Sequence, residues 1–364
     1  MYRSTLRNRL HLLIAVLALS VLIAACGSSE AATPDNDASD DTAEAPADDD
    51  TADAGDDASD EDDTDTDGAF DGGSVSILMN WLPQAEQGGY WQAAEEDLGA
   101  DDGLEIEIVS GGSGVQTIAN VAVGSADYGL VGSDALLEAR SQGIPVVMIL
   151  GGFESPQCLM THPEAGVEGI HDLHDSQISV TPAGTFWRWI AAEFGYEDSE
   201  VIPPADLATF FDTPDMVRQC FATSEPYTAE QEGHDIEVFM VSDVGYQPYS
   251  TGLFTTEERI EEHPEEVAAV VAVTMEGWER FLEDNTAGAE AIMEANPDMT
   301  KDRIDDSTVR IADELYADGV GVMEADRWQE LYEQLDGVEV LAAEIDPLEG
   351  FTTEFMDAYL ENAQ

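Results

Sequence analysis

Basic side chains are scarce in this sequence of 364 residues. Lysine and arginine together number 12, against 79 aspartate and glutamate residues, which gives a formal net charge of −67 at pH 7. Lysine occurs once, as Lys301. Because so acidic a chain is repelled by the phosphate backbone, we expect no nucleic-acid partner. We interpret the acidic surplus as an adaptation to a saline setting, in which salt screens the self-repulsion of the chain.

Cysteine is rare, and common catalytic motifs are missing. Beyond Cys26 the sequence contains Cys158 and Cys220, which either form a disulfide or remain two buried thiols. Two isolated cysteines do not predict a zinc site, and the pair His171 and His174 is more typical of a polar helix end than of a metal site. The sequence contains no G-x-S-x-G, C-x-x-C, H-E-x-x-H or Walker loop. We therefore expect no metal, no cofactor and no catalytic residues.

Residues 1–26 have the layout of an export signal. Arg3, Arg7 and Arg9 precede the apolar run LLIAVLALSVLIAA, and Cys26 follows it. The segment LIAAC resembles the lipobox of bacterial lipoproteins, whose cysteine is acylated and becomes the new N-terminus. The alternative is a single transmembrane anchor, for which the apolar run is short. We expect a lipid anchor at Cys26, with the protein on the extracytoplasmic face of the cell membrane.

Residues 27–73 have little to bury. Between Glu30 and Asp71 there are 19 acidic residues and no lysine or arginine. Such a composition predicts a disordered, extended tether. A calcium-binding array is the alternative, but no D-x-D-x-D-G segment is followed by a glutamate at the twelfth position.

The remaining chain alternates between strand and helix patterns. Residues 74–81, 104–112, 126–132 and 144–153 read as strands, separated by helical spacing at 86–98, 113–124 and 133–143. This rhythm predicts an α/β fold with parallel strands. A second α/β unit follows, with helices expected at 185–195 and 214–222, and from Glu257 onward the pattern is almost entirely helical. We expect residues 74–155 to form the first part of lobe 1, 156–244 to form lobe 2, and 245–364 to return to lobe 1 and end in helices.

Several short motifs in order between about residues 80 and 280 resemble one family, the NMT1/THI5-like substrate-binding proteins of ABC importers. The motifs are Trp81-Leu82-Pro83, GSADYG at 124–129, Glu225-Pro226-Tyr227, GYQPY at 245–249 and EGW at 276–278. The resemblance implies a type II periplasmic-binding-protein fold, two α/β lobes joined by two crossover segments. It also implies a monomer that closes by a hinge on a small molecule and delivers it to a membrane permease.

In open α/β sheets, ligands bind beyond the carboxyl ends of the strands. Trp81 and Tyr90 follow the first such end, where they offer flat faces to a planar ring, although core packing is the alternative. We expect Gly88 and Gly89 to let the backbone approach the ligand. Relatives often carry a histidine after the W-L-P motif, where this sequence has Gln87. We keep Gln87 as a candidate ligand contact, and the departure argues against the pyrimidine-synthase activity of some relatives.

The later strand ends supply the other candidates. Ser113 and Asp134 each follow a strand, with a tight turn and helix capping as the respective alternatives. Thr185 and Trp187 lie in a loop that relatives commonly use to hold ligand. The remaining candidates are the family-matched Glu225 and Tyr227, together with three residues of the second crossover, for which hinge packing is the alternative: Asp243, Tyr246 and Tyr249.

The candidate cleft is rich in aromatic and acidic residues and poor in basic ones. This combination favours a neutral or cationic planar heterocycle with N–H donors, such as a thiamine-precursor pyrimidine, with riboflavin as the next choice. Taurine, sulfonates or nitrate would need more donors than the pattern offers. Some relatives are pyridoxal-phosphate-dependent pyrimidine synthases, but their Schiff base needs a lysine. Lys301 stands far from every strand end, so this alternative is disfavoured.

Overall fold

The computed structural model describes residues 72–315 and 319–362, all of which belong to one compact unit, Thr64–Gln364. The export signal, Cys26 and nearly all of the predicted tether lie outside the described residues. Among the helices that are described, none is both long enough and apolar enough to cross a bilayer.

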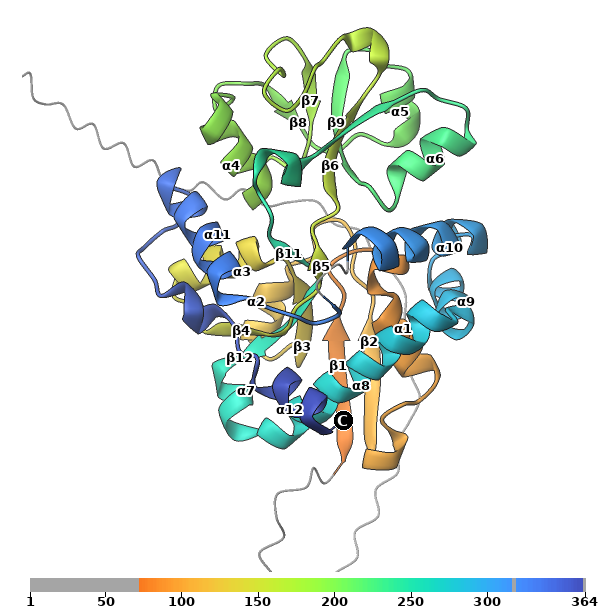
Figure 1. Ribbon diagram of the computed structural model, residues 1–364, viewed down its shortest axis with the longest axis vertical. Coiled ribbons are helices and arrows are strands. Elements are labelled where there is room, and N and C mark those ends of the chain that lie inside the picture. The colour runs from red at the N-terminus through yellow and green to blue at the C-terminus, as the bar shows by residue number, and fades with distance from the viewer. Residues whose placement is uncertain (1–71, 316–318, 363–364) are drawn as a thin grey trace, which may run out of the picture. The chain divides into compact units, whose positions relative to one another are not determined.

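Lobe 1 is built around a five-stranded sheet in the order β2-β1-β3-β12-β4 (Figure 1). Its strands are β1 (Gly73–Leu78), β2 (Leu104–Val109), β3 (Tyr128–Val131), β4 (Val146–Leu150) and β12 (Gly252–Thr256). β1 pairs with β2 and β3 in parallel, whereas β12 runs antiparallel to both β3 and β4. The sheet is therefore mixed, because the chain re-enters it from lobe 2 in the opposite direction.

Both faces of this sheet are buried. Leu78, Val131 and Met148 belong to one hydrophobic cluster, while their neighbours Ile77 and Leu130 belong to another. Successive side chains of a strand point to opposite faces, so an apolar run such as VVMIL in β4 fits a sheet covered by helices on both sides. The edge strand β2 differs, since it alternates apolar residues with exposed glutamates, which protect a sheet edge from pairing.

The helices and turns of lobe 1 come from both parts of the chain. They are η1 (Ala85–Gln87), α1 (Gly88–Glu95), η2 (Ala100–Asp102), α2 (Thr117–Ala122), α3 (Ser133–Ser141), α7 (Glu257–Glu262), α8 (Pro264–Glu283), α9 (Thr286–Ala295), α10 (Lys301–Arg310), η5 (Ile311–Leu315, a π-helix), α11 (Ala325–Gly337), η6 (Pro347–Gly350) and α12 (Glu354–Asn362). Helix α8, the predicted amphipathic segment with Pro264 at its first turn, packs against α1 and α12.

Lobe 2 has its own five-stranded sheet, in which Figure 1 labels β6, β7, β8 and β9. The strand order is β10-β6-β9-β7-β8. Its strands are β6 (Gln157–Thr161), β7 (Gln177–Ser179), β8 (Val201–Ile202), β9 (Met216–Phe221) and β10 (Glu237–Met240). Its helices and turns are η3 (Pro163–Ala165), α4 (Thr185–Phe194), α5 (Leu207–Phe211), α6 (Glu225–Gln231) and η4 (Val241–Val244). β6 pairs antiparallel with β9 and β10, whereas β7 pairs in parallel with β8 and β9.

The expected helix at 214–222 is wrong, because Met216–Phe221 forms the central strand β9. Its short apolar run fits either a buried strand or a helix segment, and periodicity alone does not separate the two. These residues form a strand because they pair with β6 on one side and with β7 on the other.

Two further features link the elements. β5 (Phe153–Glu154) pairs antiparallel with β11 (Tyr249–Ser250), so the two connections between the sheets lie side by side. Cys158 and Cys220, directly opposite each other in the β6–β9 ladder, form a disulfide. Of the two states that the sequence left open for these cysteines, the structure contains the bridge.

Candidate ligand-binding site

A cavity of about 180 Å³ lies where the two lobes and their connections meet. Its lining comes from the carboxyl ends of β1, β3 and β9, the start of β6, the first turn of α4 and the β5 and β11 connections. The lining residues are Asn80, Gly132, Asp134, Ser155, Gln157, Phe186, Phe221, Pro248, Tyr249 and Ser250. This is the position at which open α/β sheets bind ligands.

The lobe 1 wall of the cavity is polar. Gln87 donates from Nε2 to Oδ1 of Asn80 at 3.1 Å, which orients the Asn80 amide at the end of β1. Asp134, in the first turn of α3, accepts hydrogen bonds from the Tyr246 hydroxyl and the Ala135 N–H, each at 2.8 Å. Burial of the Asp134 carboxyl raises its pKa, although these two hydrogen bonds oppose the rise.

Tyr249, which lines the cavity, is held by contacts to three residues. Its N–H donates to Oγ of Ser133 at 2.9 Å, and its hydroxyl accepts from the N–H of Glu324 at 2.9 Å. The Arg327 guanidinium carbon lies 4.1 Å from the centre of the Tyr249 ring. A ring fixed in this way loses little freedom when a ligand packs on it.

The lobe 2 wall is mainly aromatic. Phe186 comes from the first turn of α4, and Phe221 is the last residue of β9. Gln157, the first residue of β6, is opposite Phe221 in the ladder and donates from Nε2 to the carbonyl of Cys220 at 3.2 Å. Two phenyl rings and an amide on one wall suit a flat ligand with polar edges.

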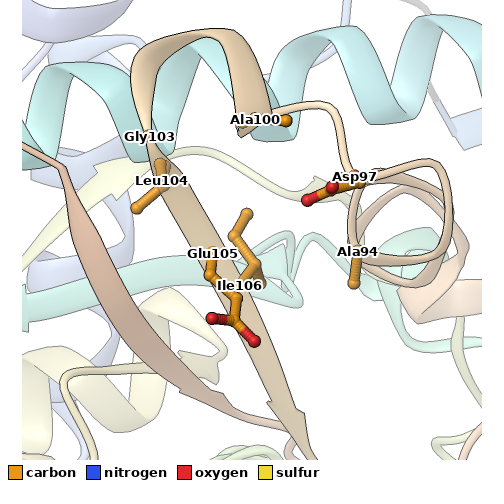
Figure 2. A pocket seen from close by; sticks show the side chains of 9 residues that line it. Ala94, Asp97, Ala100, Gly103, Leu104, Glu105 and Ile106 are labelled. Carbon is orange, nitrogen blue, oxygen red and sulfur yellow. The ribbon is translucent and has the colours of Figure 1, made fainter.

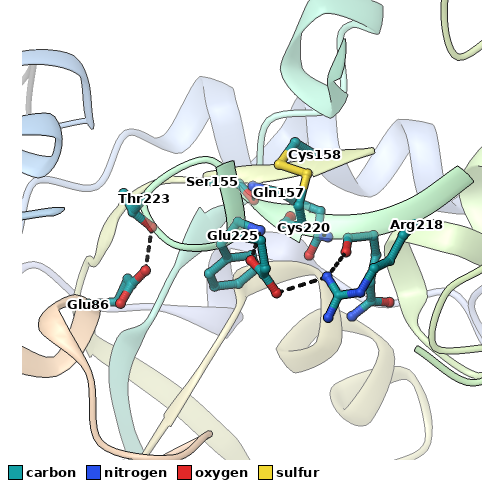
Figure 3. The surroundings of a disulfide bond; sticks show 10 residues. Glu86, Ser155, Gln157, Cys158, Arg218, Cys220, Thr223 and Glu225 are labelled. Carbon is teal, nitrogen blue, oxygen red and sulfur yellow. Dashed lines mark hydrogen bonds and ion pairs between the residues drawn. A yellow bond between two sulfur atoms is a disulfide. The ribbon is translucent and has the colours of Figure 1, made fainter. Parts of the chain in front are cut away.

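Beside the cavity, the two lobes make a buried polar contact that we name the clasp. Thr223 donates from its hydroxyl to the Glu86 carboxylate, as Figure 3 shows, and its carbonyl accepts from the Ser307 hydroxyl at 2.5 Å. Arg303 donates to Oγ of Ser224 at 2.5 Å. Glu86 is 2% exposed, and desolvation raises the pKa of its carboxyl, against the lowering effect of the hydrogen bond from Thr223. A second contact joins α3 to α4, where Glu138 accepts hydrogen bonds from Thr185 and Arg188.

Of the twelve residues expected to bind ligand, Asp134 and Tyr249 line the cavity. Three others contact a lining residue: Gln87 through Asn80, Tyr246 through Asp134, and Glu225 through the N–H of Phe221. Thr185 is the neighbour of Phe186 in α4, and its own hydroxyl is bonded to Glu138.

The other expected residues lie off the lining. Tyr90 is 1% exposed, packs edge-on against Trp278 in the core of lobe 1 and donates to the carbonyl of Thr251. Trp187 is buried and stacks on Tyr196. The remaining four are the exposed Ser113 and Asp243, the half-buried Tyr227, and Trp81, which is 43% exposed.

The glycine pair at 88–89 has a packing role, in place of the ligand approach expected from the sequence. A Cβ atom on Gly88 would lie 2.2 Å from the Phe281 ring, and one on Gly89 would lie 2.3 Å from the Trp278 ring. These glycines therefore let α1 approach α8 closely, and Tyr90 is carried into the core with them.

Sequence reasoning missed most of the aromatic wall. Phe186 directly follows the chosen Thr185, so the loop was found and the neighbouring side chain was not. Phe221 was not considered because a helix was expected at 214–222. Had a strand been expected there, the strand-end rule would have identified Phe221 as a candidate. Asn80 is the second residue after β1, where the strand-end rule applies directly.

A second, larger hollow of about 470 Å³ lies between α1, η2 and the start of β2 (Figure 2). Its charged lining residues are the acids Asp97 and Glu105. It opens beside the amino end of β2, away from the strand ends that bind ligands, so we do not assign it the ligand. In the described part of the chain, no group of three or more His, Cys, Asp or Glu side chains is arranged to hold a metal ion.

A family model described as NMT1/THI5 like matches residues 84–287, which is more than half of the chain. The chain belongs to the NMT1/THI5-like family. Its curated relatives include the riboflavin-binding protein RibY of Chloroflexus aurantiacus, 21% identical over 78% of this chain and 86% of the relative. They also include the formylaminopyrimidine-binding protein of Halalkalibacterium halodurans, 23% identical over 72% of this chain and 84% of the relative.

Solved structures show the same fold at low identity. The periplasmic aliphatic sulphonate-binding protein SsuA of Escherichia coli superposes with a TM-score of 0.59, at 13% identity over 77% of this chain and 92% of that one. The alkanesulfonate-binding protein SsuA of Xanthomonas axonopodis pv. citri, bound to MOPS, gives a TM-score of 0.58, at 11% identity over 77% and 98%. The fold of this NMT1/THI5-like chain is thus the periplasmic-binding-protein fold, as the motifs implied. The two curated relatives are named as binding proteins for small molecules, and the two structural neighbours as sulfonate-binding proteins.

Proposed function

We propose that this chain captures a small planar heterocycle with N–H donors, neutral or cationic, and delivers it to a membrane permease of an ABC importer. The observation that carries the proposal is the half-buried Asp134 carboxyl, which lines the same cavity as the aromatic side chains Phe186, Phe221 and Tyr249. A carboxylate accepts hydrogen bonds from ring or exocyclic amines, and the aromatic rings suit a flat partner.

The size of the cavity supports a ligand with one ring. Its volume of about 180 Å³ is below the roughly 300–1,000 Å³ of pockets that take drug-sized molecules. We therefore favour an aminopyrimidine of the thiamine-precursor kind, close to the ligand named for the Halalkalibacterium relative. Riboflavin, named for the Chloroflexus relative, has three fused rings and would need a wider separation of the lobes.

The charge of the cavity supports an uncharged or positive ligand over an anion. None of the described lining residues is lysine or arginine. The first turn of α3, which could offer N–H groups to an anion, already holds the Asp134 carboxylate through the Ala135 N–H. Sulfonate or nitrate would bring a negative charge beside the Asp134 carboxyl without a basic partner.

We propose capture without chemical conversion. Lys301, which a Schiff-base reaction would require, lies in α10 and donates from Nζ to Oδ1 of Asn285 at 2.8 Å and to Oδ1 of Asp305 at 2.5 Å. It is not among the described residues that line the cavity.

The proposed anchor is a lipid on Cys26, as the LIAAC segment suggests. Replacing Cys26 with serine should move the protein from the detergent-soluble membrane fraction into the aqueous fraction. A C26S protein that stays in the membrane fraction would favour a transmembrane anchor.

Calorimetry on the mature protein tests the proposed ligand class. Formylaminopyrimidine, riboflavin and taurine are titrated under the same conditions, at a salt concentration that keeps this acidic chain soluble. We expect saturable binding of formylaminopyrimidine, weaker binding of riboflavin and no heat from taurine. Tight binding of taurine with no response to formylaminopyrimidine would overturn the proposal.

A further inference from the structure

The end of one β-ladder forms part of the cavity wall. In the antiparallel pairing of β6 with β9, Cys158 is opposite Cys220, and the next pair outward is Gln157 opposite Phe221. Both residues of that outer pair line the cavity. The disulfide therefore lies one ladder step behind the wall, where it ties together the two strands that present Gln157 and Phe221 (Figure 3).

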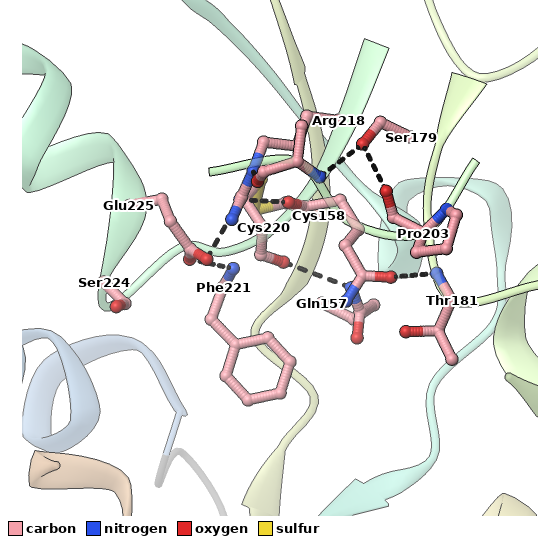
Figure 4. A network of polar contacts seen from close by, with 12 residues as sticks. Gln157, Cys158, Ser179, Thr181, Pro203, Arg218, Cys220, Phe221, Ser224 and Glu225 are labelled. Atoms are coloured by element: carbon pink, nitrogen blue, oxygen red, sulfur yellow. Dashed lines mark hydrogen bonds and ion pairs between the residues drawn. A yellow bond between two sulfur atoms is a disulfide. The ribbon is translucent and has the colours of Figure 1, made fainter. Parts of the chain in front are cut away.

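A carboxylate fixes the same wall from the other side. Glu225, in the first turn of α6, accepts from the Phe221 N–H at 2.9 Å through Oε2 and from Nη1 of Arg218 at 3.0 Å through Oε1 (Figure 4). The Phe221 N–H is not used in the pairing with β6, whose next backbone hydrogen bond runs from the Ala222 N–H to the Pro156 carbonyl at 2.9 Å.

Arg218 is anchored in turn, so the carboxylate is held by a rigid group. It is 9% exposed and donates to the carbonyl of Ala205 at 2.7 Å and to that of Gln219 at 2.6 Å, in addition to Glu225. Each Glu225 oxygen thus accepts a hydrogen bond from the protein itself, and Glu225 is outside the cavity lining.

We propose that the Cys158–Cys220 disulfide and the Glu225 carboxylate are positioning groups, which fix Gln157 and Phe221 as a preformed wall for the ligand. The inference rests on the proposed function, because it concerns the same cavity. It gives Glu225 a role different from direct ligand contact. A wall ordered before binding saves the ligand the cost of ordering it, so losing either group weakens binding without removing any ligand contact.

The first test compares two substitutions on α6 that make the same chemical change. Glu225→Gln places an amide NH₂ against one of two donors, whereas Glu230→Gln alters an exposed residue of the same helix. We expect E225Q to bind formylaminopyrimidine about 2- to 10-fold more weakly, the range for immobilising one side chain, and E230Q to match the parent. Equal affinity of E225Q and the parent would overturn the role of Glu225.

The second test separates positioning by the disulfide from its effect on stability. The double variant Cys158→Ala, Cys220→Ala removes the bridge, and Phe210→Leu destabilises the same buried cluster without touching the wall. We expect both variants to melt at lower temperature, and the cysteine variant alone to lose about 2- to 10-fold in affinity. If affinity follows melting temperature in both, the disulfide has no positioning role. If the cysteine variant does not fold, the parent protein titrated after reduction gives the same comparison.

Hydrogen exchange provides a readout that needs no ligand. The Phe221 amide should exchange faster in E225Q than in E230Q, because its hydrogen-bond acceptor is weakened. Unchanged exchange would contradict the inference even if the ligand class is right. If the parent binds none of the calorimetry ligands while the Phe221 amide responds as expected, the ligand assignment fails and the Glu225 support of the wall stands.

Discussion

The two walls of the cavity are built in different ways. On the lobe 1 side, Asn80 and Asp134 follow strands of a parallel ladder, and their polar groups are oriented by Gln87 and Tyr246. On the lobe 2 side, Gln157 and Phe221 end an antiparallel pair that is covalently bridged. Under the proposed function the two walls therefore have different tasks: lobe 1 provides hydrogen-bonding selectivity, and lobe 2 provides a flat, fixed surface.

Removing the acid from the lobe 1 wall should have the largest effect. In Asp134→Asn, the ligand loses a hydrogen bond to a charged or strongly polar acceptor, so we expect affinity for formylaminopyrimidine to fall about 10- to 100-fold by calorimetry. Asp243→Asn is the matched control, because Asp243 is exposed and off the cavity, and it should bind like the parent. Equal losses of affinity in D134N and D243N would show that Asp134 does not contact the ligand.

Removing the ring from the lobe 2 wall should have a smaller and less selective effect. Phe221→Ala loses about 1–2 kcal/mol of stacking and burial, which weakens binding of any flat ligand roughly 5- to 30-fold. Phe211→Ala is the control, because its ring stacks on His234 at 3.7 Å, outside the cavity. We expect D134N to lower the affinity for rings with N–H donors more than for rings without them, and F221A to lower both affinities equally. If the two variants changed the ratio of these affinities by the same factor, the division of tasks between the lobes would be wrong.

The clasp between the lobes should show itself in the pH dependence of stability. Burial raises the pKa of Glu86, so its contribution to stability is fully present below the unfolded pKa, ordinarily about 4.3, and is lost as the pH rises through the folded pKa. In Glu86→Gln the side chain at this position does not titrate, so it contributes no pH-dependent term to the free energy of unfolding. Relative to the parent, E86Q should therefore gain unfolding free energy as the pH rises above about 4, by about 1.4 kcal/mol for each unit by which folding raises the pKa.

Denaturant melts of E86Q and the parent across that range give the measurement, and Glu230→Gln serves as the exposed control. A constant difference between E86Q and the parent at every pH would mean that Glu86 has the same pKa in both states.

The smallest effect on binding is expected at Tyr90. Tyr90→Phe removes the hydrogen bond to the Thr251 carbonyl in the core and should lower the free energy of unfolding by about 1 kcal/mol, with ligand affinity unchanged. Tyr359→Phe on α12 removes an exposed hydrogen bond from its hydroxyl to Glu279 at 3.3 Å, so it should lower the free energy of unfolding by less and leave affinity unchanged. A loss of ligand affinity in Y90F would indicate that Tyr90 contacts the ligand.

Lobe 1 could be predicted in more detail than lobe 2, for a physical reason. Its strands and helices alternate along the chain, so local patterns locate most elements, and the strand-end rule led to Asp134. In lobe 2 the central strand β9 is decided by pairing with β6 and β7, which are distant in sequence, so the expected helix was wrong.

The same distinction applies to the side chains of the site. Tyr90 looked like a ligand contact because it stands beside two glycines near a strand end, yet those glycines let α1 pack on α8 and place its ring in the core. Glu225 matched a family motif, but its partners Arg218 and Phe221 become its neighbours only once β9 is a strand followed by a turn into α6. Such contacts depend on tertiary structure and leave no local pattern in the sequence.

The crystal structure of the protein with formylaminopyrimidine is the most direct test of the central claim. We expect the ring to lie against Phe186 and Phe221, with a ligand N–H within about 3.2 Å of an Asp134 carboxyl oxygen. A ligand bound beside Trp81 or in the hollow at the start of β2, with Asp134 contacting only the protein, would contradict the assignment of the cavity.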